Sequence, residues 1–142
     1  MRIHSKILIS ISVILFISCQ NKVDNQSCDI PINPNGDSEL SILMRDMIKD
    51  SEQAKKQIEL GEKPNFLIDY EKLHSAKATD PKLRENGSYT NLSNAYLASI
   101  KNLKESDDLY EEKYNNLIQE CVNCHMSFCP GPIKRIKKLK IK

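Results

Sequence analysis

The sequence predicts an all-α fold built as a four-helix bundle. Three long segments repeat apolar residues at steps of three and four, which is the period of an amphipathic helix. No stretch stands out with the alternation of a half-buried strand. The connections are short, and short connections favour helices that lie side by side with a site in their interior. With 142 residues there is room for one domain and one modest core.

The first helix is expected from about Ser38 to Leu60. Asp37 or Ser38 can cap its start, because both side chains accept hydrogen bonds from free backbone N–H groups. Gly61 follows the end, where a glycine readily takes the left-handed backbone conformation. The inward stripe is formed by Leu40, Leu43, Met44, Met47, Ser51, Ala54 and Ile58.

Two further helical segments follow. The second is short and comes after Pro64, with Phe66, Tyr70 and Leu73 on one face. The third is a full helix with the same three-four spacing. Its stripe consists of Tyr89, Leu92, Tyr96, Ser99 and Leu103.

The last long helix is expected after Ser106-Asp107-Asp108, with Glu111 placed to complete a capping box from Asp108. Pro130-Gly131-Pro132 ends it. Its inward stripe contains Tyr110, Tyr114, Leu117, Cys121, Cys124 and Phe128. Two cysteines therefore lie in phase with the core face of this helix.

The N-terminus has the pattern of an export signal. Residues 1–18 combine a basic start with a short apolar run that ends at a small residue, and the run is too short to span a membrane. Phe16-Ile17-Ser18-Cys19 resembles the bacterial lipobox, which implies lipidation of Cys19. We therefore expect a lipoprotein of the bacterial cell envelope, anchored in the periplasm or the outer membrane. Residues 19–36 are polar and aperiodic, as expected for a tether.

The mature chain is balanced in charge but uneven along its length. Residues 1–18 carry two bases and no acid, so their removal takes the formal net charge from +2 to zero. Residues 37–133 are assigned to the bundle and 134–142 to a basic C-terminal tail. So short a basic run on an exported chain does not indicate nucleic-acid binding. A solvated helix end, an acidic partner and a lipid surface are all compatible with it.

Cys121-Val122-Asn123-Cys124-His125 is the motif with the most specific chemistry. Two cysteines one helical turn apart match the two vinyl groups on one edge of haem, to which their sulfurs add covalently. The adjacent histidine then projects under the ring and can bind iron. The motif predicts one covalently attached haem c, with His125 as an axial ligand.

Three alternatives compete with haem. A zinc site could use Cys121, Cys124, His125 and Cys129, but Cys124 and His125 point about 100° apart on a helix. A thioredoxin-like redox pair is expected in a βαβ setting, which the pattern lacks. A plain disulfide between Cys121 and Cys124 is the third. If Cys121 and Cys124 hold haem and Cys19 is lipidated, Cys28 and Cys129 are left, and two such thiols outside the cytoplasm tend to pair as a disulfide.

The motif near the end of the last helix resembles class II cytochromes c, the cytochrome c′ and c556 group. Specific residues match only from Cys121 to Phe128, and Pro130-Gly131-Pro132 ends the helix earlier than the family pattern does. The resemblance implies an antiparallel bundle with His125 as proximal ligand. It also implies a methionine of the first helix as sixth ligand in electron carriers. Met44 fits that placement best, and Met47 is the second choice.

We therefore expect an electron-transfer protein with His/Met ligation, not an enzyme, that exchanges electrons with redox proteins of the envelope. The family often forms dimers, so a homodimer is compatible. A gas-binding protein with five-coordinate iron is the first alternative. A haem-free lipoprotein stapled by a disulfide is the second.

Overall fold

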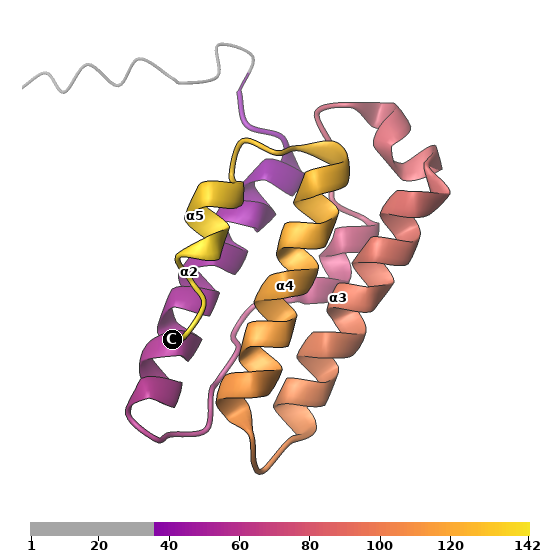
Figure 1. Cartoon of the computed structure of the whole chain (residues 1–142). Coiled ribbons are helices and arrows are strands. Elements are labelled where there is room, and N and C mark those ends of the chain that lie inside the picture. Colours follow the sequence, from indigo (N-terminus) through magenta and orange to yellow (C-terminus); the bar gives the residue numbers. More distant parts are fainter. Residues whose placement is uncertain (1–35) are drawn as a thin grey trace, which may run out of the picture. The chain divides into compact units, whose positions relative to one another are not determined.

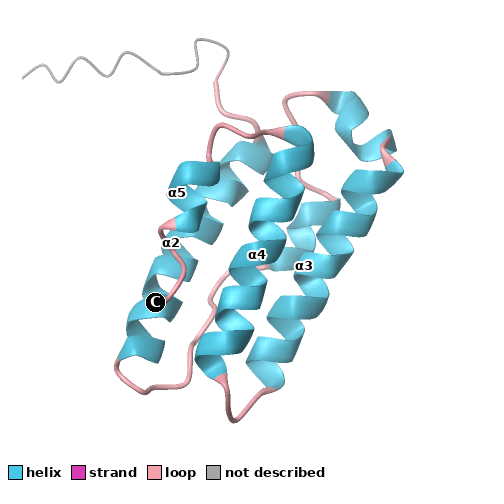
Figure 2. Ribbon diagram, viewed as in Figure 1, coloured by secondary structure: helices cyan, strands magenta, loops and turns pink. Residues whose placement is uncertain are grey.

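The structure is a computed structural model that describes residues 36–142. Within that range it contains helices and no strand, so the predicted all-α class is confirmed. The long helices are α2 (Glu39–Glu59), α3 (Gly87–Glu105) and α4 (Tyr110–Phe128), and a short helix, α5 (Ile133–Lys137), follows. Figure 1 shows α3 and α4 as a hairpin, with α5 folded back beside α2. Figure 2 shows loops as the only other structure in this range.

The start and end of α2 follow the predicted capping. The hydroxyl of Ser38 accepts a hydrogen bond from the Ser41 backbone N–H at 3.2 Å. Gly61, just after the helix, has φ +75°. Only glycine takes that conformation without steric cost, so Gly61 lets the chain leave the helix axis.

The second predicted helix is a 3₁₀ turn, η1 (Tyr70–His74), and another 3₁₀ turn, η2 (Pro81–Glu85), follows beyond the predicted segment. The predicted inward residues still face the core: Phe66, Tyr70 and Leu73 are all buried. Asp50 of α2 accepts hydrogen bonds from the Leu67 N–H and the Tyr70 hydroxyl, at 3.2 Å and 2.5 Å to Oδ2. These bonds tie the segment before η1, and the first residue of η1, to α2.

The predicted capping box of α4 does not form. The helix begins at Tyr110, after Leu109 in the left-handed conformation (φ 52°), and no side chain caps it. Asp108 and Ser106 are used by the turn instead, because Lys113 Nζ contacts the Ser106 hydroxyl and lies 3.0 Å from Asp108 Oδ1. The same residue types therefore stabilise the connection and not the helix end.

Residues 134–142 are not a free tail. Ile136 and Leu139 are buried in the core at 1% and 4% exposure, although lysines surround them in the sequence. Asn115 of α4 binds the backbone N–H and carbonyl of Ile141 at 2.9 and 3.0 Å. Lys55 of α2 donates to the Lys140 carbonyl at 2.9 Å. The C-terminal segment thus packs against both helices.

The core lies where α3, α4, α2 and η1 meet. α3 and α4 pack along their length, whereas α2 and α4 approach each other at few points. Fully buried residues at the centre are Leu103, Tyr114, Leu117 and Ile118. The space between α2 and the last turns of α4 is where the candidate site lies.

Candidate functional site

The Cys121–His125 motif occupies the last two turns of α4, on the side that faces α2. Cys121, Cys124 and His125 are each partly buried, and Cys129, one residue after the helix, is exposed. The motif sits there because Leu117, Ile118 and Val122 bury the adjoining face of α4 against the core. The predicted inward phase of both cysteines therefore agrees with the structure.

Three cavities surround the motif. The largest of these three, below called the largest cavity of the site, has a volume of about 440 Å³; it is bounded by α2, α4 and the segment after α4, and is lined among others by Met44, Met47, Cys121 and His125. Its walls are mostly apolar side chains, and residues of α5 close one side. Such an apolar lining favours an apolar ligand over a small hydrated ion.

The second and third cavities adjoin the same residues. The second, about 190 Å³, lies near the start of α2 and is lined by Met44, Cys124, His125 and Phe128, with further residues of the loop and of α3. The third, about 30 Å³, reaches toward α3 and includes both cysteines. Met44 and His125 line all three cavities, each cysteine lines two, and Met47 lines two.

The imidazole of His125 is oriented by the turn that follows it. His125 Nδ1 lies 2.9 Å from the carbonyl oxygen of Cys129. A carbonyl can only accept, so this contact places the proton on Nδ1 and leaves a lone pair on Nε2. A histidine held in this way is suited to bind a metal through Nε2.

Burial keeps both motif thiols protonated. It raises the pKa of the Cys121 thiol to about 12, with a smaller contribution from the nearby Cys124. Burial also raises the pKa of Cys124. Catalytic redox cysteines have a lowered pKa instead, because the thiolate is the reactive form. The electrostatics therefore do not favour a thioredoxin-like pair.

A buried polar group next to the site was missed by the sequence analysis. Asp50 is 6% exposed and is held by Tyr70, whose ring packs 5.8 Å from that of Tyr96. Tyr96 lines the smallest cavity, and its hydroxyl makes no hydrogen bond within 3.5 Å. Burial raises the Tyr96 pKa well above its ordinary value. The one signal in the sequence was an acid at position 50, beside Met47, Ser51 and Ala54 on the inward stripe of α2.

Two arginines border the largest cavity, and sequence reasoning gave them no role. Arg45 of α2 pairs with Asp37 at 2.5 Å, and Arg135 of α5 pairs with Glu52 at 3.5 Å. Both side chains are largely solvent-exposed. They form the polar edge of an otherwise apolar space.

Several predicted residues lie elsewhere. Cys19 and Cys28 fall outside the described residues, so lipidation and the Cys28–Cys129 disulfide stay predictions. In the range 36–142, no three His, Cys, Asp or Glu side chains converge as a metal site would require. Over the same range no helix is long and apolar enough to cross a membrane. His74, the other histidine in this range, is exposed at the end of η1.

Comparison with known proteins does not assign a family. No protein-family model matches the chain, and no curated protein or solved structure is significantly similar to it.

Proposed function

We propose that this protein is a mono-haem c-type cytochrome that transfers electrons and is exported and lipid-anchored at the bacterial cell envelope. In this proposal Cys121 and Cys124 hold the haem through thioether bonds, His125 is the proximal iron ligand and Met44 is the sixth ligand. The long helices α2, α3 and α4 would then belong to an antiparallel bundle of the class II cytochrome kind, with the segment around η1 in the place of its second helix.

The observation that carries the proposal is the set of donors around one apolar space. Two thiols one helical turn apart, an imidazole with a free Nε2 and a methionine thioether on the facing helix all line the same group of cavities. Thioether and imidazole are the ligands of electron-transfer haem iron, and the cysteines match its covalent attachment. This donor set fits haem c.

The residues of the chain have separate tasks in this mechanism. Haem would supply the iron that gains and loses one electron. His125 is held by the Cys129 carbonyl in the tautomer that presents Nε2. Met44 would supply a thioether ligand from α2, and methionine ligation would favour the reduced form of the iron. The mostly apolar walls would surround the group with a low local dielectric.

The proposal is tested by expressing the full chain with a cytochrome maturation system and measuring its intact mass and absorption spectrum. We expect a mass higher by one haem and a low-spin spectrum. Replacing both Cys121 and Cys124 by Ser should abolish attachment, whereas Cys129→Ser, the matched control, should retain it. A mass without haem would refute the proposal. A high-spin spectrum that shifts with carbon monoxide would favour a gas-binding protein instead.

A further inference from the structure

We propose that the surface beside the largest cavity is the docking site for an acidic redox protein. This surface, the basic face, consists of Arg45, Lys134, Arg135, Lys137 and Lys138. The inference rests on the proposed function, because it assigns the route by which electrons reach the site. The chemistry of the partner follows from charge, position and the contacts of α5.

The basic face carries charge that the protein itself does not neutralise. Residues 131–142 contain six bases and no acid. Arg45 and Arg135 are paired with Asp37 and Glu52. Lys134, Lys137 and Lys138 are exposed, and none of them forms an ion pair with another residue of the described range 36–142. Three positive charges therefore stay available to a partner.

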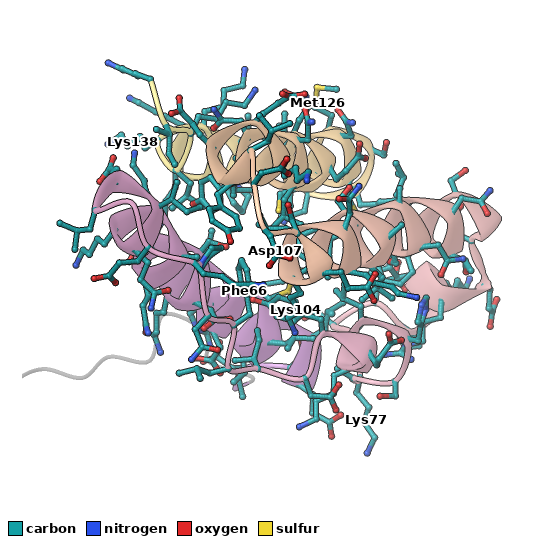
Figure 3. The ribbon with its side chains drawn as sticks, turned by 90° about the horizontal axis from the view of Figure 1, so that it is seen from below. Phe66, Lys77, Lys104, Asp107, Met126 and Lys138 are labelled. Atoms are coloured by element: carbon teal, nitrogen blue, oxygen red, sulfur yellow. The ribbon has the colours of Figure 1, made fainter. Side chains whose placement is uncertain are left out.

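Packing fixes where these charges point. Ile136 and Leu139 anchor the C-terminal segment in the core, and Lys55 holds its backbone carbonyls. With Ile136 turned inward, Lys134, Lys137 and Lys138 are left on the outer side of α5. In Figure 3 the labelled Lys138 lies beside α5, whereas Lys77 lies on the opposite side of the molecule. The basic face is therefore a fixed surface and not a mobile tail.

The acids at the other end of α4 are largely compensated, unlike the lysines of the basic face. Residues 105–112 carry five acids and no base, but Lys101, Lys63 and Lys113 pair with Glu105, Asp107 and Asp108. In Figure 1 the turn between α3 and α4 lies at the opposite end of α4 from the loop that leads into α5. The unpaired lysines therefore set the local charge beside α5, which orients an approaching acidic partner.

The position of the basic face favours a protein over a membrane as its partner. Arg45 and Arg135 line the largest cavity as well as belonging to the basic face. A protein bound there is brought next to the proposed haem site, where electron transfer is fastest. A lipid bilayer on the same surface would cover that cavity without bringing a redox group to it. We therefore assign the basic face to an acidic protein.

The experiment measures binding and electron transfer on the haem-loaded full chain. The test variant is Lys134→Glu/Lys137→Glu/Lys138→Glu, and the control is Lys72→Glu/Lys77→Glu/Lys82→Glu. The control makes the same change in net charge on exposed lysines outside the basic face. The probes are an oligoglutamate peptide, vesicles of phosphatidylglycerol, and the anionic oxidant ferricyanide beside the cationic hexaammineruthenium(III).

We expect the test variant to bind oligoglutamate about tenfold or more weakly and to reduce ferricyanide more slowly by a similar factor, because close charges set association rates. The control should change both by much less, and the reaction with hexaammineruthenium(III) should not slow. Both effects of the test variant should fade as salt screens the charges.

Equal losses in the two variants would overturn the proposal, since net charge alone would then explain binding. Lysine-dependent binding to phosphatidylglycerol without binding to oligoglutamate would also overturn it and assign the surface to lipid. An unchanged rate of ferricyanide reduction in the test variant would show that electrons do not reach the site by way of the basic face, which would also overturn the proposal. The two binding measurements do not need haem, so a failure of the proposed function is distinguishable from a failure of this inference.

Discussion

Met44 and Met47 lie on the same side of α2, and their structural surroundings predict different consequences of truncation. Met47 is 7% exposed and packs in the core. Met44 is only partly buried and borders three cavities, so its side chain already faces open space. Replacing Met44 by Ala should therefore affect ligation, and replacing Met47 by Ala should affect packing.

The magnitudes follow from these surroundings. Met47→Ala should lower the free energy of unfolding by about 2–5 kcal/mol, as for other buried methionines. Met44→Ala should lower it by about 1 kcal/mol, because less apolar area is lost from contact. In the haem-loaded protein, Met44→Ala should convert the low-spin spectrum to one with an open or water-bound position and should lower the reduction potential.

Two measurements separate the effects. Urea denaturation of the haem-free chain reports packing, and the absorption spectrum of the loaded chain reports ligation. Met126→Ala is the control, because Met126 is 61% exposed on the outside of α4 and should change neither. The reasoning would be refuted by an unchanged spectrum for Met44→Ala together with a high-spin spectrum for Met47→Ala.

Three further predictions concern thiol reactivity, a buried hydrogen bond and the C-terminal segment. At pH 8 in the haem-free chain, a Cys121 pKa of about 12 against an ordinary 9.0 lowers its thiolate population by roughly 10³-fold. Alkylation by iodoacetamide, followed by peptide mass mapping, should therefore label Cys129 first, and equal rates would contradict the burial. Tyr70→Phe should lower the free energy of unfolding, measured by urea denaturation, by about 1–3 kcal/mol, because it removes a hydrogen-bond donor from the buried Asp50. A change near zero would mean that water replaces the hydroxyl. Ile136→Ala should lower the free energy of unfolding by about 2–5 kcal/mol in the same assay, whereas Lys134→Ala should change it by no more than about 0.5 kcal/mol. Similar changes for both variants would show that α5 does not pack against the core.

Alkaline pH provides another test of the core. Burial raises the pKa values of Tyr70, Tyr96 and Tyr114 above the ordinary 10.0. Above pH 10 the unfolded chain loses these protons more readily than the folded one. The stability that the buried tyrosines contribute is therefore complete below that pH and falls as the pH rises further. Thermal melts followed from pH 8 to 11 should show a declining midpoint, and a flat profile would contradict the burial of the hydroxyls.

Helical phase could be predicted from sequence because it depends on local spacing. The periods that placed Leu40, Met47, Tyr96 and Tyr114 inward are properties of single helices, and each of these residues is buried. The cap at Ser38 was likewise local, since its hydroxyl bonds an N–H three residues on.

The missed features depend on contacts between distant segments. In the sequence, Asp50 only interrupts the apolar stripe of α2. In the fold, Leu67 and Tyr70, from another part of the chain, donate hydrogen bonds to it. Residues 134–142 read as a tail because lysines dominate their composition. Two apolar residues among them, Ile136 and Leu139, find a groove that only the folded helices create. Similarly, Lys113 contacts Ser106 and Asp108, which therefore do not cap α4, and only the folded turn brings these groups together.

The packing of α5 has a consequence for access to the site. Arg135, Ile136 and Leu139 form one wall of the largest of the three cavities around the motif. The backbone of this segment is held by Lys55 at the Lys140 carbonyl and by Asn115 at the Ile141 carbonyl. A bulky group that enters the cavity from this side would therefore have to break those contacts first.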